Sequence, residues 1–247
     1  MLRTFRDRAI VLRSYKLGEA DRIVILFGEN TGQFRAVAKG VRRTTSKFGA
    51  RLESFNVVDV QCYRGKGDLD TLIQADTISA YSASLADKFA AFTNAKLTVE
   101  AAQKMTAGQE LPSPEQFALL HGALHALASE SKPPSLVASS YLLRMAAVEG
   151  WQPTLTACAV CGGSERLDHF SPASGGAVCT DCTPFEAMVV EPEVLALMDA
   201  LITPDWQRAL RFPQRVWGDS VDIAGSWVQW QLEQRLRALP FATGSQT

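Results

Sequence analysis

Four of the five cysteines in this chain occur as two Cys-x-x-Cys pairs. Cys158 and Cys161 form the first pair, Cys179 and Cys182 form the second, and Cys62 stands alone. Two such pairs separated by roughly 15 to 20 residues are a recognised zinc spacing, because each pair offers two thiolates and together they complete a tetrahedron. Four thiolates fill the coordination sphere. The spacing therefore predicts one structural Zn²⁺ ion and no open position for hydrolysis.

Other uses of these cysteines stay open at this point. Two local disulfides or a redox dithiol would employ the same pairs. His169 lies between the pairs and could replace one cysteine, although a lone histidine is more often a solvated loop residue. Gly162 and Gly163 follow the first pair, where a tight turn helps backbone N–H groups to reach the sulfurs. These glycines favour the metal interpretation.

Positive charge is concentrated at the start of the chain. The first 52 residues carry 12 Lys and Arg against 4 Asp and Glu, a balance of +8, whereas the whole chain has a net charge of −1. The other 195 residues hold 13 basic and 22 acidic side chains, a balance of −9. The basic excess peaks at residues 39–51, where cations alternate with glycines and small hydroxyls suited to a mobile loop. Such a composition favours phosphate as the ligand.

The segregation of charge predicts a DNA-binding surface in the first part of the chain. A merely solvated basic loop is the alternative, and the size and charge of the segment weigh against it. Tyr15 and Phe48 are candidates for base stacking, although Phe48 could equally be a core residue. The cations that we expect to contact DNA are Arg22, Arg35, Lys39, Arg42, Arg43, Lys47 and Arg51.

Residues for catalysis are not evident. The sequence contains no phosphate-binding Gly-x-x-x-x-Gly-Lys-Ser/Thr loop, no Gly-x-Ser-x-Gly and no His-Glu-x-x-His. His121 and His125 stand four residues apart without an obvious third ligand, so packing or surface roles are the better interpretation. Turn and edge-strand positions explain Asp68, Asp70 and Asp76 more simply than a magnesium site. We expect no enzyme and no small-molecule substrate.

The elements that would position these residues change in character near residue 80. Before it, short apolar segments alternate with turn sequences, and Val58, Val60 and Cys62 alternate with polar residues. Five strands in about 80 residues fit a five-stranded barrel of the oligonucleotide-binding (OB) type, in which the basic segment would be one of the longer connections. The strands are expected at residues 9–12, 22–27, 33–39, 55–63 and 69–78.

After residue 80 the sequence predicts helices. Ser113 and Ser135 are expected to start two of them, and further helices are expected at residues 191–201 and 221–239. The cysteine module, at about 155–185, interrupts this helical region. The fold class is therefore α+β and multidomain. An OB barrel at residues 1–80 precedes a mainly α-helical domain at 81–247 that carries the inserted four-Cys zinc knuckle.

Several motifs before residue 80 occur in a specific order and spacing. They are the run from Gly18 to Phe27, Gly32, residues 38–43 (AKGVRR), 46–48 (SKF), 52–55 (LESF) and 72–76 (LIQAD). With these motifs, the first 80 residues resemble the N-terminal domain of the bacterial DNA repair protein RecO family. The later helices and the cysteine quartet look like the rest of that family, although some members lack the cysteines.

The resemblance implies a non-enzymatic recombination mediator of the RecF pathway. Such proteins bind single- and double-stranded DNA, anneal complementary strands, and work with RecR to load a recombinase onto strands coated by single-strand-binding protein (SSB). A link to the acidic, hydrophobic C-terminal tail of SSB would need a pocket with cations, for which Lys132 and Arg144 are candidates. The acidic remainder of the chain is expected to dock proteins and not DNA.

The composition of the chain limits where in the cell the protein is expected. The chain has 247 residues, 47% of them apolar and 21% charged, and no apolar run approaches the roughly 20 residues that span a bilayer. We see no secretion signal, so we expect a cytoplasmic, nucleoid-associated protein with reduced thiols. Two rival functions remain: a zinc-ribbon interaction or transcription-associated module without annealing activity, and a metal-dependent nucleic-acid hydrolase.

Overall fold

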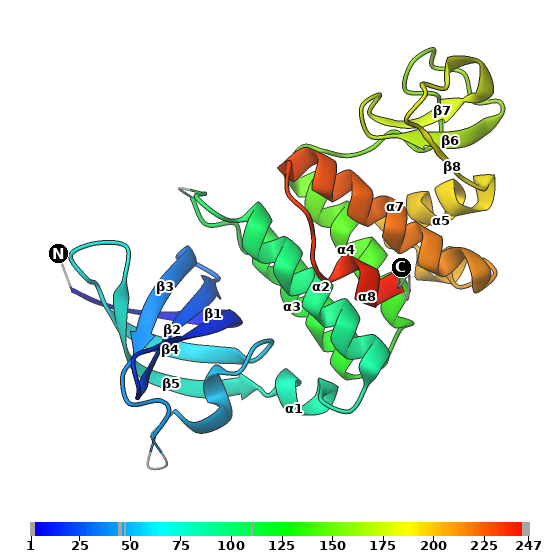
Figure 1. Cartoon of the computed structure of the whole chain (residues 1–247). Coiled ribbons are helices and arrows are strands. Elements are labelled where there is room, and N and C mark those ends of the chain that lie inside the picture. The colour runs from blue at the N-terminus through cyan, green and yellow to red at the C-terminus, as the bar shows by residue number, and fades with distance from the viewer. Residues whose placement is uncertain (1–2, 44–45, 47, 110, 244–247) are drawn as a thin grey trace. The chain divides into compact units, whose positions relative to one another are not determined.

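The computed structural model describes residues 3–43, 46, 48–109 and 111–243 (Figure 1). Lys47, one of the expected DNA contacts, lies outside the described residues. The chain forms two compact units. The first comprises Met1–Ala95 with Ala102–Ser129, and the second comprises Lys96–Ala101 with Glu130–Thr247. The first unit therefore contains, besides its strands, the helices α1 (Tyr81–Leu85) and α3 (Pro114–Ala128) and most of α2 (Phe89–Met105). The domain boundary expected at residue 80 stays a prediction.

Five strands close into a barrel in the first unit. Their order is β1-β2-β3-β5-β4, and neighbouring strands are antiparallel except β3 and β5, which run parallel. This is the order of the OB type, so the predicted fold class is confirmed. The strands are β1 (Thr4–Leu17), β2 (Asp21–Gly28), β3 (Gly32–Ala38), β4 (Val57–Tyr63) and β5 (Asp70–Ser79).

Strand β1 is much longer than the expected 9–12. Its first half pairs with β4, from Thr4 opposite Tyr63, and its second half pairs with β2, up to Leu17 opposite Asp21. A bulge between Val11 and Arg13 separates the two halves. A bulge bends a strand and shifts its inside–outside alternation, so no single two-residue period runs through the whole of β1. Only its apolar centre was recognisable from sequence.

The barrel interior is filled by alternate strand residues and by the segment between β3 and β4. Phe48, which is 1% exposed, and Leu52 of the 3₁₀ helix η1 (Gly49–Leu52) pack against Val11, Val24 and Val60. Phe48 is therefore a core residue. Its alternative role in base stacking is wrong, because a stacking residue must present a ring face to solvent.

A buried carboxylate fixes the turn between β2 and β3. Asp7 of β1 is 4% exposed and accepts hydrogen bonds from the backbone N–H groups of Asn30 (3.0 Å) and Thr31 (2.9 Å). The side chains of Asn30 and Thr31 donate to it as well, at 2.9 and 2.8 Å. A side chain on Gly28 would overlap Asp7 and Thr31. These four donors offset the cost of burying the charge.

Three helices complete the first unit: α1 (Tyr81–Leu85), α2 (Phe89–Met105) and α3 (Pro114–Ala128). Ser113 caps α3, accepting a hydrogen bond from the N–H of Gln116, as the sequence predicts. Phe27 on the outer side of β2 packs against Phe117 of α3, with ring centroids 6.0 Å apart. Gln33 of β3 accepts a hydrogen bond from Thr106 at 3.1 Å. Helices thus cover part of the outer surface of the barrel.

The second unit is helical, with a small sheet inserted. Ser139 and Ser140 of α4 donate hydrogen bonds to backbone carbonyls of α7 and α5, at 3.1 and 2.8 Å. Helix α7 begins before the expected residue 221 and ends before 239, because Glu233 adopts a left-handed conformation with φ 53°. The elements are α4 (Pro134–Val148), β6 (Leu167–Ser171), β7 (Gly176–Cys179), the 3₁₀ helix η2 (Thr180–Cys182), β8 (Met188–Val189), α5 (Pro192–Ile202), α6 (Trp206–Ala209), α7 (Arg215–Leu232) and α8 (Leu239–Thr243).

Candidate metal centre and nucleic-acid interface

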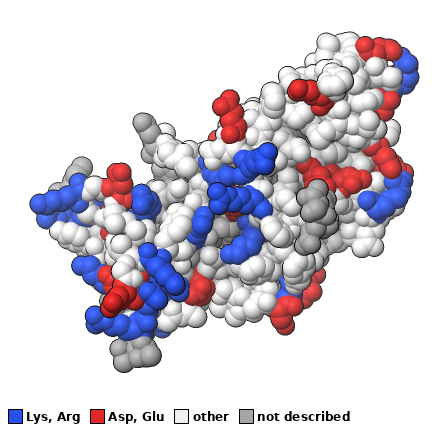
Figure 2. Space-filling view, viewed as in Figure 1, with Lys and Arg blue, Asp and Glu red and all other residues white. Residues whose placement is uncertain are grey.

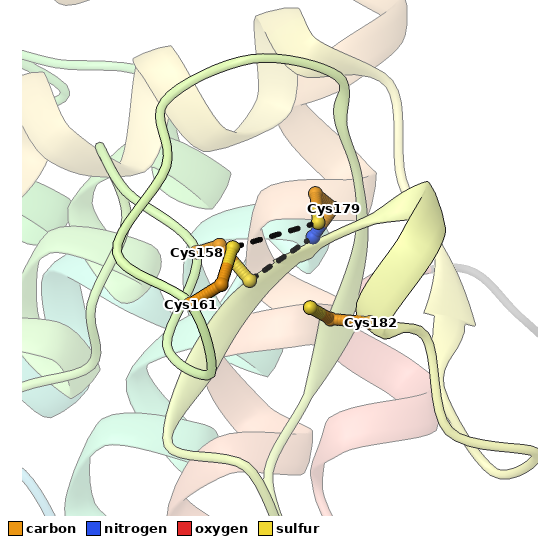
Figure 3. A group of neighbouring side chains, drawn as sticks. All are labelled: Cys158, Cys161, Cys179 and Cys182. Atoms are coloured by element: carbon orange, nitrogen blue, oxygen red, sulfur yellow. Dashed lines mark hydrogen bonds between the residues drawn. The ribbon is translucent and has the colours of Figure 1, made fainter.

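The four paired cysteines come together at one point of the inserted sheet (Figure 3). Cys158 and Cys161 lie in the loop before β6, Cys179 ends β7, and Cys182 ends η2. Their sulfur atoms all lie within 4.8 Å of one another, and those of Cys161 and Cys179 are 3.9 Å apart. A tetrahedron with metal–sulfur bonds of about 2.3 Å places its sulfurs roughly 3.8 Å apart. The cluster can therefore hold a metal ion with little movement.

Local backbone geometry brings the first pair toward the second. The N–H of Cys158 donates to the carbonyl of Gly163 at 2.7 Å, and the N–H of Gly162 donates to the carbonyl of Cys158 at 2.8 Å. Gly162 has φ 77°, a conformation that favours glycine. The N–H of Cys179 reaches the sulfur of Cys158 at 3.4 Å. This is the tight turn that the two glycines indicate.

The sulfurs influence one another's ionisation. Backbone N–H groups, first that of Cys161 and then that of Cys179, lower the pKa of Cys158 to about 6. Hydrogen bonds with the sulfurs of Cys179 and Cys161 raise the pKa of Cys182 to about 12. An ionised neighbour disfavours a second thiolate, so four thiolates in this volume need a cation between them.

Local disulfides, one of the alternatives for the cysteines, are not formed in the structure, whereas a redox dithiol would also consist of free thiols. All five cysteines are free thiols, so no disulfide joins the pairs. His169 does not belong to the group of possible metal ligands. Its Nδ1 lies 2.7 Å from a carboxylate oxygen of Asp168, whose other oxygen accepts a hydrogen bond from Thr180 at 2.9 Å. The predicted ligand set of four cysteines is thus brought together without His169.

The expected DNA contacts divide into exposed and engaged cations. Arg35, Lys39 and Arg43 are exposed and have no carboxylate partner in the described part of the chain. Arg51 is also exposed. In contrast, Arg22 pairs with Glu53, with 3.1 Å between Nη1 and Oε1. The predicted surface is therefore smaller than the sequence suggested, because a paired guanidinium offers less charge to a phosphate.

The start of the basic segment is anchored and not loose. The guanidinium of Arg42 donates to the carbonyls of Glu19 (2.8 Å) and Gly18 (3.3 Å) in the turn between β1 and β2. The N–H of Gly40 donates to Asp21 at 2.7 Å. These bonds bring residues 39–43 against the β1–β2 turn, so Arg42 has a structural role. Both Arg42 and its neighbour Arg43 are exposed, but no such hydrogen bond holds the side chain of Arg43 among the described residues.

Cations elsewhere on the barrel are also engaged. Arg6 makes three hydrogen bonds to Asp59, two from its Nε at 2.8 and 3.0 Å and one from its Nη2 at 2.5 Å. The Nε of Arg8 donates to Glu29 at 3.0 Å. Asp59 holds the pKa of Arg6 above its ordinary value, mainly through these hydrogen bonds. Figure 2 shows the resulting mixture of signs over the barrel. The local excess of +8 is therefore partly compensated.

The sequence analysis did not identify Arg3 and Arg64 as candidate DNA contacts, because neither belongs to a run of basic residues. Arg3 and Arg64 flank the aromatic residues Phe5 and Tyr63 where β1 begins and β4 ends, and both are exposed. In the sequence, the only indication of this cluster is that an aromatic residue lies close to a basic residue at each of the two strand ends. That indication is insufficient by itself, because the two strand ends are 60 residues apart and only their pairing brings them together.

The histidine pair and Asp70 have structural partners. The hydroxyl of Tyr81 lies 3.2 Å from Nε2 of His121 and 3.3 Å from Nδ1 of His125. Asp70 is 7% exposed and accepts a hydrogen bond from the N–H of Gly65 at 3.0 Å. Within residues 3–43, 46, 48–109 and 111–243, the cysteine cluster is the one group suited to hold a metal. In the same ranges, no helix has the length and apolar character needed to cross a bilayer.

The fold and its sites define a class of protein: an OB barrel with exposed cations, joined to a helical region with a four-cysteine cluster. Comparison with known families agrees. Residues 1–81 match the family model described as "Recombination protein O N terminal", and residues 88–240 match "Recombination protein O C terminal". The chain therefore belongs to the RecO family of DNA repair proteins.

Individual relatives support the same assignment over nearly the full length. A protein from Frankia casuarinae named DNA repair protein RecO is 41% identical over 237 residues, covering 96% of this chain and 97% of the relative. Proteins of the same name from Cutibacterium acnes and Thermobifida fusca are 39% and 42% identical, over 96% and 95% of this chain. They are covered over 98% and 96% of their own lengths.

Proposed function

We propose that this chain is a non-enzymatic recombination mediator that binds single- and double-stranded DNA through its barrel and anneals complementary strands. The observation that supports the proposal most directly is the exposure of Arg35, Lys39 and Arg43 without carboxylate partners in the described structure of an OB barrel. Exposed cations of this kind bind phosphates without reading bases. Membership of a DNA repair family adds the biological setting.

The metal in this proposal is Zn²⁺, held by all four cysteines. Soft thiolate ligands in a tetrahedral arrangement favour zinc, and a four-thiolate site has no open position for a reacting water. Cys161 and Cys182 are at least partly exposed, so the ion has an entry path. Zinc would thus stabilise the inserted sheet and would not take part in a reaction.

The partners in this proposal are RecR and the C-terminal tail of SSB, with which the protein would help to load a recombinase. The acidic balance of the chain after residue 52, −9, supports a protein-docking role for the helical region. Lys132, one of the cations considered for the SSB tail, lies 5.7 Å from the ring centroid of Trp206. Its ammonium group therefore has an aromatic neighbour that an acidic, hydrophobic peptide could also contact. A cytoplasmic, nucleoid-associated location follows from the same proposal.

An annealing assay with labelled complementary oligonucleotides tests the function. We expect the purified chain to accelerate annealing without ATP and without Mg²⁺, because phosphate binding requires neither. The Lys39→Ala/Arg43→Ala variant should anneal several-fold more slowly, since it loses two exposed cations of the proposed grip. The control is Arg208→Ala/Arg211→Ala, which removes two exposed cations from the other unit and should leave the rate unchanged.

The same assay separates the rival functions. A zinc-ribbon interaction module would show no acceleration, and a metal-dependent hydrolase would cleave the strands when Mg²⁺ is added. Either result contradicts the proposal. With SSB-coated strands, acceleration should require the intact SSB tail, and equal rates with tail-less SSB would remove the tail from the list of partners.

A further inference from the structure

A cluster of two arginines and two aromatic residues lies where β1 begins and β4 ends. The hydroxyl of Tyr63 accepts a hydrogen bond from Nη1 of Arg3 at 2.9 Å. The backbone carbonyl of Arg3 accepts a hydrogen bond from the N–H of Arg64 at 2.7 Å. The guanidinium carbon of Arg64 lies 4.5 Å from the ring centroid of Phe5. The four residues therefore form one connected arrangement, which we name the Tyr63 cluster.

The cluster is built on the barrel core. The ring of Phe5 meets that of Phe34 at 5.5 Å and 73°, an edge-on contact, and both rings pack against the buried interior. The guanidinium of Arg64 thus lies over an aromatic ring that is itself packed against the barrel core. A cation–aromatic contact and an anchored tyrosine hydroxyl both restrict side-chain rotation, so less entropy is lost when a ligand binds.

The cluster offers an aromatic ring and positive charge to solvent. Tyr63 is 37% exposed, and both arginines are exposed. Neither arginine has a carboxylate partner among the residues that the structure describes. The adjoining β4–β5 loop adds exposed Lys66 and Asp68. The remaining charge is positive, in contrast to the neighbouring pair of Arg6 and Asp59, whose charges compensate each other.

The cluster is separate from the basic segment after β3. The Tyr63 cluster lies at the start of the 14-residue strand β1. The basic segment is hydrogen-bonded to the β1–β2 turn, which follows the last residue of β1. Thirteen steps of about 3.3 Å give a path of roughly 40 Å along this bent strand, which is an upper limit for the straight-line separation. Figure 1 shows the β4–β5 loop beside the start of β1, and the end of β3 at the opposite end of the barrel. The Tyr63 cluster and the basic segment therefore lie at different ends of β1.

We propose that the Tyr63 cluster is a second subsite for single-stranded nucleic acid, in which a base stacks on Tyr63 and the flanking phosphates contact Arg3 and Arg64. The proposal rests on the proposed function and extends it to a surface that no charge run marks. An exposed ring beside cations binds single strands of any sequence, because every base has a stacking face. A duplex hides those faces, so the subsite would prefer unpaired DNA.

Binding measurements with two ligands test the subsite. One ligand is a thymidine oligonucleotide, and the other is an abasic strand of the same length, which keeps the phosphates and lacks the bases. We expect Tyr63→Ala to weaken binding of the thymidine strand about tenfold and to leave binding of the abasic strand nearly unchanged. Ile78→Ala removes another exposed side chain of the barrel and should affect neither ligand. Equal affinities for wild type and Tyr63→Ala would overturn the proposal, as would equal losses for both ligands.

A second readout does not depend on the stability of Tyr63→Ala. Strands that contain 5-iododeoxyuridine become photocrosslinked to stacked aromatic side chains, and mass spectrometry should find the crosslink at Tyr63. Tyr63→Phe keeps the ring and should bind within about twofold of wild type. Absence of a crosslink at Tyr63 would overturn the subsite. If the wild type bound neither ligand, the proposed function would fail with it; if only Lys39→Ala/Arg43→Ala weakened binding, the subsite alone would fail.

Discussion

At the scale of single residues, the environment of His121 shows how burial and charge select one protonation state. Its ring is packed near Tyr81 and Phe117, at centroid distances of 6.1 and 6.2 Å. Burial lowers the pKa of His121 below its ordinary value; Arg8 and His125 lower it further, while Glu29 opposes them. The folded protein therefore prefers a neutral imidazole at this position, which suits its contact with the Tyr81 hydroxyl.

This lowered pKa predicts how stability changes with pH. Because the folded state binds the His121 proton less tightly than the unfolded state, its contribution is present above about pH 6.5 and is lost as the pH falls below it. His121→Gln cannot titrate and should make the unfolding free energy of the first unit less dependent on pH between 7.5 and 5.5. At pH 7.5 we expect a cost of about 1 kcal/mol from the altered hydrogen bond.

Urea unfolding followed by circular dichroism at both pH values measures this effect. Tryptophan fluorescence would not, since all five tryptophans lie after residue 150, in the second unit. His169→Gln, which changes a histidine in the second unit, is the control. The interpretation is wrong if wild type and His121→Gln lose the same stability on acidification.

At the scale of elements, the inserted sheet depends on its cysteines. Its three strands, in the order β7-β6-β8, are short, and the buried residues around the cluster are Cys158, Val178 and Cys179. So small an apolar core supplies little hydrophobic stabilisation, so binding of a metal ion by the cysteines would contribute directly to folding. The barrel, by contrast, has a larger apolar core, which includes Leu26, Phe48 and Leu52, so we expect it to keep its fold without the metal.

Removal of the metal should therefore loosen one element and spare another. A chelator should increase hydrogen exchange of the backbone at residues 158–189 at least tenfold while exchange in the barrel strands stays unchanged. Fluorescence should report the change as well, because Trp227 packs against Phe170 of β6 at 6.0 Å. Elemental analysis should find one zinc per wild-type chain and much less in Cys182→Ser.

Cys62 supplies the matched control for this experiment. It is fully buried in the barrel, and burial raises the pKa of its thiol to about 12, which makes it a poor metal ligand. Cys62→Ala should keep the full zinc content. Equal metal contents in wild type and Cys182→Ser would show that the cluster does not hold the ion.

At the scale of the whole molecule, charge asymmetry sets how the chain responds to salt. The first 52 residues carry a balance of +8, but ion pairs with Asp59, Glu29 and Glu53 engage three of their arginines. In the proposed function, phosphate binding would then rest on a few exposed cations and not on the total charge. Each phosphate that is neutralised releases counterions, so affinity must fall as salt rises.

A salt titration measures the number of contacts. With three to five phosphates bound, the logarithm of the affinity for single strands should fall against the logarithm of salt with a slope of about −2 to −3.5. Lys39→Ala/Arg43→Ala should reduce the steepness by roughly 1.4, since each lost contact contributes about 0.7. Arg6→Ala, which removes a paired cation, should change the slope much less. A flat response in the wild type would contradict the phosphate grip.

The sequence by itself determined the features that local patterns encode. The two-residue alternation of Val58, Val60 and Cys62 indicated a strand of the barrel, and Ser113 marked the start of α3. The spacing of the cysteine pairs indicated the four side chains that the structure brings together, because thiols a few residues apart in a tight turn point the same way. Composition was sufficient to place an excess of cations in the first unit.

Tertiary structure decided what depends on partners distant in sequence. It extended β1 across two neighbouring strands, buried Phe48, and engaged Arg22 and Arg42 in contacts within the protein. It also placed Arg3 beside Tyr63, 60 residues away. Closure of the barrel sets these pairings through strand register, which is a property of several strands at once, so no local stretch of sequence contains it.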